Sequence, residues 1–212
     1  MNQPKRSIEW TVWGGLVLVM LAVVGAFILS KTGLTGSGLR VYGVVPQFSL
    51  TNQFERVVSL ADLRGTVWVA DIIFTRCPGP CLKMTRLMGE LQAQLPADAP
   101  VKLVSLTADP EFDTAEVLRR YAERFRATPD RWQFLTGQKR DLYRLATKGL
   151  LLALEEVKPE QRESENDLFV HSTLMVVVDR QGRIRASFEG AEPASRDKIL
   201  DAIHALLKEK SS

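Results

Sequence analysis

Residues 66–81 read Thr-Val-Trp-Val-Ala-Asp-Ile-Ile-Phe-Thr-Arg-Cys-Pro-Gly-Pro-Cys, an apolar run that ends in two cysteines. The apolar part, 66–74, is typical of a buried strand, and the apolar residues that follow Cys81 recur at helical spacing. The cysteines therefore mark a strand-to-helix junction, with Cys81 in the first turn of the helix. Proline is tolerated in that turn because the first helical amides have no partner inside the helix. Those free amides and the helix dipole stabilise a thiolate, the form that binds metal or attacks a disulfide.

Three roles compete for Cys77 and Cys81, the two cysteines of this 212-residue chain. A structural disulfide would close a very small ring and remove little entropy from the unfolded chain. A redox pair is the second role. A regular helix holds Cβ atoms at i and i+4 farther apart than a disulfide prefers, so the bond would need an irregular Pro-Gly-Pro turn. A soft-metal site is the third role, because two converging thiolates need only one or two more donors to hold Cu(I) or Zn(II).

The chain has two histidines that are candidates for a further donor. His204 lies in an amphipathic helix predicted over 194–208, where a solvated or half-buried position is its expected role. His171 follows a polar loop and directly precedes the apolar run 173–178, which is typical of a central strand. Because the sites of open α/β sheets gather at strand ends, His171 is the better candidate for a third donor beside the two cysteines.

The rest of the domain alternates strands with helices and closes with a hairpin and a helix, which is the order of a thioredoxin-like α/β fold. The expected strands are 66–74, 101–107, 132–135, 173–179 and 183–188, preceded by an N-terminal β-hairpin formed by 42–50 and 56–59. The expected helices are 81–95, 113–126, 137–148 and 194–208, and the polar stretch 155–167 is expected to be exposed near the site. Asp113 is expected to cap its helix together with Glu116.

Other side chains near the cysteines have both structural and functional interpretations. Met84 and Met88 are soft donors, but both fit the apolar face of their helix, so core packing is their expected role. Asp109 follows a central strand and either supports the site from outside or contacts a partner. Arg76, beside Cys77, either stabilises a thiolate or an anionic partner or is a solvated charge.

A run of 20 uncharged residues, Trp10 to Leu29, is long enough to cross a bilayer as a helix. Lys5 and Arg6 precede it, and positive residues stay on the cytoplasmic side of a membrane. A cleaved signal peptide is the alternative, although its apolar core is normally shorter. We expect an uncleaved, single-pass anchor in a bacterial inner membrane, with the rest of the chain in the periplasm.

The expected organisation is a short cytoplasmic tail (1–9), a transmembrane anchor (10–30), a flexible tether (31–41) and one domain (42–212). The formal net charge is +3, and no basic patch is strong enough to suggest nucleic acid as a partner. An exported domain with no cysteines beyond this pair has no disulfide framework, so the pair was not placed for general stability.

Three segments follow one another along the chain, with Tyr121 between the last two: Phe74-Thr75-Arg76-Cys77-Pro78-Gly79-Pro80-Cys81, Val104-Ser105-Leu106-Thr107-Ala108-Asp109-Pro110-Glu111-Phe112-Asp113-Thr114, and His171-Ser172-Thr173. In these segments and their order, the chain resembles the Sco (SenC) family, over roughly residues 42–208. Many members have a proline directly after the second cysteine, where this chain has Leu82. Thioredoxin-type reductases carry a cis-proline where this chain has Ser172 and Thr173.

The resemblance implies a membrane-anchored, thioredoxin-like copper protein of cytochrome c oxidase assembly, with Cys77, Cys81 and His171 as the copper ligands. It implies delivery of copper to the CuA site of cytochrome c oxidase subunit II or to another periplasmic acceptor. The alternative is a thiol-disulfide oxidoreductase that reduces the acceptor's cysteines through the same redox-active pair, with a thioredoxin-like protein as its reductant. A copper-responsive redox sensor is a further alternative.

Overall fold

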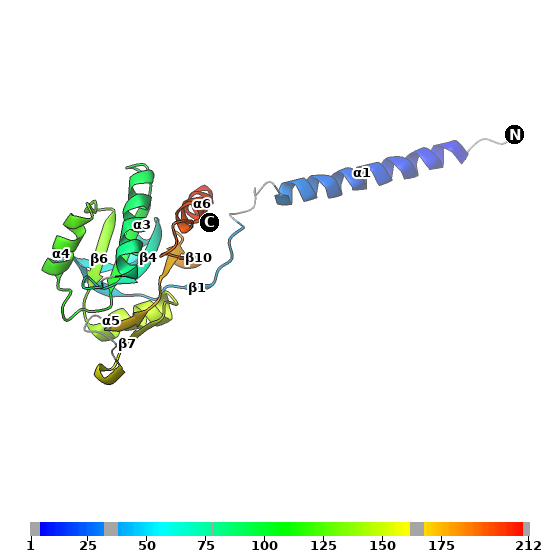
Figure 1. The fold of residues 1–212 in the computed structure, drawn as a ribbon. Helices are drawn as coiled ribbons and strands as arrows, with labels where there is room; N and C mark the ends of the chain where they lie inside the picture. Colours follow the sequence, from blue (N-terminus) through cyan, green and yellow to red (C-terminus); the bar gives the residue numbers. More distant parts are fainter. Residues whose placement is uncertain (1–4, 32–37, 78, 162–167, 210–212) are drawn as a thin grey trace. The chain divides into compact units, whose positions relative to one another are not determined.

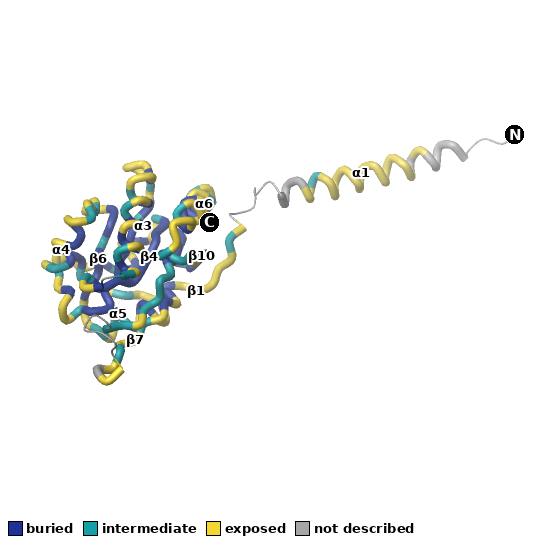
Figure 2. Tube along the Cα trace, in the orientation of Figure 1, coloured by how far each residue is buried: buried dark blue, intermediate teal, exposed yellow. Residues whose placement is uncertain are grey.

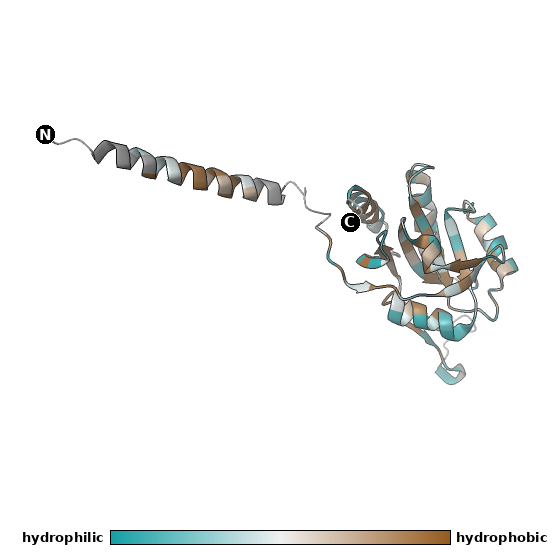
Figure 3. Cartoon of the chain, turned by 180° about the vertical axis from the view of Figure 1, so that it is seen from behind, coloured by the Kyte–Doolittle hydropathy of each residue, from teal (hydrophilic) through white to brown (hydrophobic). Residues whose placement is uncertain are grey.

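The computed structural model describes residues 5–31, 38–77, 79–161 and 168–209, which belong to two units, Met1–Gly38 and Leu39–Ser212 (Figure 1). The first unit contains helix α1 (Lys5–Lys31), which is most hydrophobic along its middle (Figure 3). Among the residues that are described, no helix combines the length and the apolar character that crossing a membrane requires.

The second unit is built on an eight-stranded mixed sheet with the strand order β1-β10-β9-β4-β5-β6-β2-β3. Its strands are β1 (Gly43–Val44), β2 (Ser49–Asn52), β3 (Val57–Ser59), β4 (Val67–Ile73), β5 (Val101–Thr107), β6 (Trp132–Thr136), β9 (Leu174–Val178) and β10 (Arg183–Glu189). A small separate sheet pairs β7 (Leu154–Glu156) with β8 (Phe169–His171). The helices are α2 (Leu60–Leu63), α3 (Pro80–Gln94), α4 (Ala115–Arg124), α5 (Lys139–Arg144), a π-helix (Leu145–Gly149), a 3-10 helix (Pro159–Gln161) and α6 (Ser195–Lys208).

The centre of the large sheet is parallel. β4 pairs in parallel with β5, and β5 with β6, whereas β9 runs antiparallel to β4 on its other side. Every residue of β4 is buried, as the continuous apolar sequence predicts for a strand covered on both faces. Because β4 and β5 run in the same direction, the loops at their carboxyl ends meet at one edge of the sheet, where the sites of open α/β sheets form.

The core lies on the central strands and on the inner faces of the helices (Figure 2). Met84 and Met88 of α3 are fully buried, which confirms their predicted role in packing. Trp132 stacks on Phe134 with ring centroids 4.9 Å apart, and its indole Nε1 donates a 3.0 Å hydrogen bond to the hydroxyl of Ser105. The large ring of Trp132 is thus buried while its one polar atom keeps a hydrogen-bond partner.

The N-terminal hairpin is shorter than predicted. β2 pairs with β3, but residues 43–44 pair instead with β10, where Gly43 lies opposite Ile184. The side-chain oxygen of Asn52 closes the turn between β2 and β3 by accepting hydrogen bonds from the amides of Phe54 and Arg56. The prediction that 42–50 forms one strand of the hairpin was therefore wrong for residues 43–44, which join the opposite edge of the sheet.

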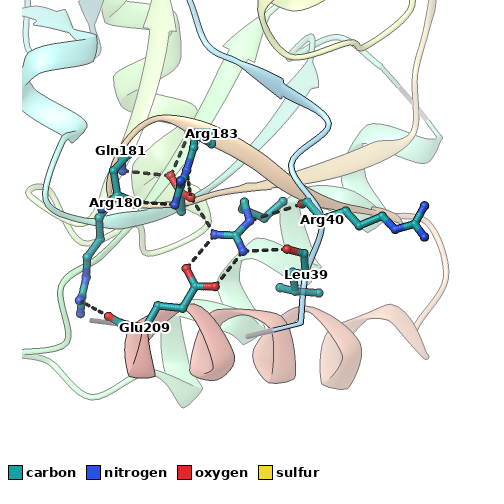
Figure 4. Close-up of polar contacts among 8 residues, drawn as sticks. Leu39, Arg40, Arg180, Gln181, Arg183 and Glu209 are labelled. Carbon is teal, nitrogen blue, oxygen red and sulfur yellow. Dashed lines mark hydrogen bonds and ion pairs between the residues drawn. The ribbon is translucent and has the colours of Figure 1, made fainter. Parts of the chain in front are cut away.

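The buried Arg185 is the centre of a polar cluster, and its partners Leu39, Arg40 and Glu209 are labelled in Figure 4. Its guanidinium donates hydrogen bonds to Asp179 at 2.9 Å and to both carboxylate oxygens of Glu209 at 2.8 Å. It also donates to the carbonyl oxygens of Leu39 at 2.8 Å and of Arg40 at 3.3 Å. Because Arg185 and Asp179 are both buried, this pairing is little screened by solvent. The cluster ties the first residues of the unit to the β9–β10 hairpin and to the end of α6.

This cluster and the cysteines lie at opposite ends of β4. The amide of Gly65, just before β4, donates a 2.9 Å hydrogen bond to the carbonyl of Arg180 in the β9–β10 turn. Cys77 follows the other end of the strand, after Ile73. The second unit therefore begins at the end of the sheet that is remote from the cysteines.

Candidate metal centre

The three side chains singled out in the sequence come together at the carboxyl end of β4. Cys77 follows a turn after β4, Cys81 is the second residue of α3, and His171 is the last residue of β8. One ligand atom from each, two Sγ atoms and an imidazole nitrogen, lie within 4.8 Å of one another. Cys81 Sγ lies 3.2 Å from His171 Nε2. Cys81 and His171 are 90 positions apart in the sequence, so it is the fold that brings them together.

The imidazole of His171 is held in one orientation. Its Nδ1 lies 3.1 Å from the carbonyl oxygen of Ser172, which can only accept, so this nitrogen carries a proton. In the neutral ring, Nε2 then presents its lone pair to the sulfurs, as a metal-binding histidine does. The ring also packs edge-on against Phe74, with centroids 5.7 Å apart.

His171 reaches the site on a small sheet that was not predicted. β7 and β8 pair with Leu154 opposite His171, and the amide of Ser172 donates a 2.8 Å hydrogen bond to the carbonyl of Ala153. The predicted polar excursion, 155–167, thus begins in β7 and includes a 3-10 helix, and its residues 162–167 lie outside the described part of the chain. The excursion is the connection that returns the chain to the site.

The two cysteines differ in acidity because they share one hydrogen bond. A hydrogen bond from Cys81, with a smaller contribution from His171, lowers the pKa of the Cys77 thiol to about 4 against the opposing effect of burial. The same bond, together with burial, raises the pKa of Cys81. The first proton is therefore lost from Cys77, and Cys81 stays a thiol that donates to the Cys77 thiolate.

Asp71 is an ionisable residue beneath the site that sequence reasoning missed. It lies within β4, is fully buried, and neither carboxylate oxygen has a hydrogen-bond partner in the described structure. Burial raises the pKa of this carboxyl to about 7, and the nearby Ser105 and His171 side chains offset the rise only in part. The signal was present in the sequence, because an acidic residue inside a continuous apolar strand is itself unusual.

Asp113 does not cap α4, and that prediction was wrong. The N-cap is Thr114, whose hydroxyl accepts from the amide of Val117 at 3.4 Å. Asp113 is turned inward and fully buried, where its carboxylate accepts hydrogen bonds from Thr75 and Thr107. Thr75 and Thr107 come close to Asp113 only in the folded protein. The sequence alone therefore indicated a cap on the adjacent helix as the role of Asp113.

Arg76 and Asp109 form an ion pair beside Cys77, and the Arg76 guanidinium lies 4.0 Å from the centroid of the Phe112 ring. The structure pairs these two residues with each other, an arrangement that the sequence analysis did not predict. His204, the other histidine, is exposed on α6 as predicted.

Two sulfurs and one imidazole nitrogen form a soft donor set that suits Cu(I) and can also take Cu(II) or Zn(II). The oxygen-rich surroundings that Mg²⁺ or Ca²⁺ prefer are not formed by these three atoms. The arrangement can therefore bind a soft metal or, with a shift of the sulfurs, form a disulfide.

A sequence model of the SCO1/SenC family matches residues 36–208 of the chain. The SCO1 protein homolog of Bacillus subtilis (strain 168) is 33% identical over 164 residues, which cover 76% of this chain and 81% of that protein. The solved structure of BsSco, a member of the Sco family of cytochrome c oxidase assembly proteins with an identified disulfide switch, is 31% identical. It has a TM-score of 0.69 and covers 81% of this chain and 98% of that one.

Bradyrhizobium japonicum ScoI, solved with copper bound, shares the fold at 21% identity with a TM-score of 0.64, covering 76% of this chain and 99% of that one. This thioredoxin-like chain therefore belongs to the SCO1/SenC family.

Proposed function

We propose that this protein is a copper metallochaperone that carries copper on Cys77, Cys81 and His171. The observation that carries the proposal is the convergence of their three donor atoms within 4.8 Å. Copper is the cargo rather than a resident cofactor, so a site with few ligands is an advantage. Three protein donors leave the metal open to an incoming ligand, and an acceptor can take it by exchange.

The acidity of the cysteines prepares the site for loading. Cys77 is a thiolate at neutral pH because its pKa lies at about 4, so one anionic sulfur is available before the metal arrives. Cys81 must lose its proton when metal binds, because the thiolate is the binding form. His171 donates through a nitrogen whose orientation is fixed by the Ser172 carbonyl.

The proposed acceptor is the CuA site of cytochrome c oxidase subunit II, or another periplasmic copper acceptor. The support is the family, since BsSco belongs to the Sco family of cytochrome c oxidase assembly proteins.

The copper proposal is tested by metal stoichiometry on the purified full-length chain. We expect one copper ion per chain. The C77S, C81S and H171A variants should bind Cu(I) more than about 100-fold more weakly, because losing a ligand should weaken binding more than losing a residue that only supports a ligand. H204A is the matched control, because His204 is exposed on α6, and it should bind as the parent does. Unchanged copper binding in H171A would contradict the proposed site.

The second candidate function is thiol-disulfide exchange that keeps the acceptor's cysteines reduced, with a thioredoxin-like protein as the reductant. One observation favours it: Cys77 is an acidic thiol beside a second cysteine, which is typical of a redox pair. His171 separates the two functions, because a metal site needs its nitrogen and disulfide exchange does not. An H171A variant that loses copper but still reduces a disulfide substrate would show that both activities exist.

We further propose that the uncharged run from Trp10 to Leu29 anchors the protein in the bacterial inner membrane, with the copper site in the periplasm. The support is the sequence, in which Lys5 and Arg6 precede the run. An anchor would hold carrier and membrane-bound acceptor at one surface and raise their effective concentration. Alkaline phosphatase fused after Ser212 should be active, whereas activity of a reporter that works only in the cytoplasm would contradict this topology.

A further inference from the structure

The two residues before Cys77 form a turn that is held by contacts with another segment of the chain. The amide of Cys77 donates a 3.1 Å hydrogen bond to the carbonyl of Phe74, so Thr75 and Arg76 are the central residues of a β-turn. The conformation of this turn therefore sets where the Cys77 sulfur lies relative to Cys81.

One segment, between β5 and α4, contacts both central residues of that turn. Asp113 accepts a 3.1 Å hydrogen bond from the amide of Thr75 and a second from its hydroxyl. Asp109 forms the ion pair with Arg76. The segment is itself closed by a 2.8 Å hydrogen bond from the amide of Asp113 to the carbonyl of Asp109.

Asp113 is the more constrained of these two carboxylates. It is fully buried, and the hydroxyl of Thr107 at the end of β5 donates to it at 2.5 Å. A buried carboxylate with three donors has few alternative positions, since each lost hydrogen bond would leave a charged oxygen unsatisfied. Arg76, by contrast, is partly exposed, and its ion pair is screened by solvent.

We propose that Asp113 is a positioning residue for Cys77: by holding Thr75 it fixes the cysteine turn, and so sets the equilibrium between the dithiol and disulfide forms of the pair. The proposal rests on the same sulfurs as the proposed function, but it does not require that they bind copper. The relevant reaction balances without metal. Two thiols release two electrons and two protons as the Sγ–Sγ bond forms, and oxidised glutathione takes them up as its own disulfide is cleaved.

The test measures this equilibrium with a glutathione redox buffer in the full-length protein. We expect D113A and T75V to change the equilibrium constant by about tenfold or more, because each removes contacts that hold the turn. We expect D113N to stay close to the parent, within about threefold. Its amide oxygen can accept from the amide of Thr75 and from Thr107, and its NH₂ group can donate to the Thr75 hydroxyl, so the geometry survives without the charge.

Asp62 provides a matched control. It accepts hydrogen bonds from the amide of Ser59 at 2.8 Å and from the hydroxyl of Ser59 at 2.6 Å, the same pair of contacts that Asp113 makes with Thr75. It lies in α2, before β4 begins, so D62A should reduce stability without changing the cysteine equilibrium.

Three results would overturn the proposal. D113A and T75V could be less stable in denaturant with an unchanged equilibrium constant, which would make Asp113 merely structural. D113N could behave as D113A does, which would make charge rather than position the cause. D62A could shift the equilibrium as far as D113A, which would make the effect unspecific. Failure of the parent to bind copper would refute the chaperone function and leave these outcomes unaffected.

Discussion

Asp71 places an ionisable carboxyl in the middle of the most buried strand, where no described donor satisfies either oxygen. Such a group is costly when charged, and its pKa of about 7 lies above the ordinary aspartate value of 3.8 because burial disfavours the carboxylate. Between these two values the folded protein holds a proton that the unfolded chain releases. The stability of the parent therefore falls as the pH rises through this window, and the loss is complete above the folded pKa.

We expect D71N to become progressively more stable than the parent as the pH is raised, because asparagine has no charge to bury. Between about pH 5 and about pH 8 the difference in free energy of unfolding should move in favour of the variant by roughly 2–3 kcal/mol. Denaturant unfolding of both proteins at a series of pH values measures it. Parallel stability profiles for the two proteins would show that Asp71 does not titrate in this range.

The convergence of Cys77, Cys81 and His171 was predictable from the sequence, whereas the positions of the residues around them were not. Two cysteines at a strand-to-helix junction and a histidine before an apolar run restrict the choice of soft donors to very few side chains. Asp113 was misassigned because a helix cap is a local pattern, while its donors Thr75 and Thr107 come from other strands' ends. Hydrogen bonds between distant segments have no periodic signature in a single sequence.

Gly190, which follows β10, is expected to tolerate no side chain. A Cβ atom there would lie 2.8 Å from the carbonyl oxygen of Thr173 and 2.8 Å from Cγ of Met175. We expect G190A to lose about 1–3 kcal/mol of stability, because the backbone next to β9 would have to move. Gly89 of α3 is the matched control, since the nearest atom to an added Cβ is 3.9 Å away.

G89A should be unchanged or more stable by up to about 1 kcal/mol, because alanine is the better residue inside a helix. Thermal or denaturant unfolding of both variants gives the comparison. Equal effects of the two substitutions would contradict the close backbone approach at Gly190.

Long elements with a clear apolar pattern were predicted close to their observed positions, as with β4, β5, α3 and α6. The short elements were harder, because β7, β8 and β1 have two or three residues each and depend on partners far along the chain. The helix predicted over 137–148 continues into a π-helix that ends at Gly149. At Gly149 an added Cβ would lie 2.9 Å from Leu145 and 3.0 Å from Pro46, so the helix ends where a side chain would be crowded.

Arg185 is expected to matter for the stability of the whole second unit, because it joins three distant parts of the chain. We expect R185M to lose about 3–5 kcal/mol, since it removes the buried partner of Asp179 and Glu209 and leaves only the more exposed Arg183 beside Asp179. R183M is the matched control: Arg183 pairs with the same carboxylate of Asp179 but is 39% exposed, so its loss should cost about 1 kcal/mol or less. Denaturant unfolding compares the two variants, and equal losses would contradict a special role for the buried guanidinium.

The direction of β4 has a consequence for where a partner could reach the cysteines. Leu39 and Arg40 are held beside Arg185 at one end of the sheet, and the two sulfurs lie at the other. A partner that approaches the sulfurs from the carboxyl end of β4 would therefore not meet Leu39 or Arg40. Substitutions in the Arg185 cluster should then alter stability while leaving such an encounter unaffected.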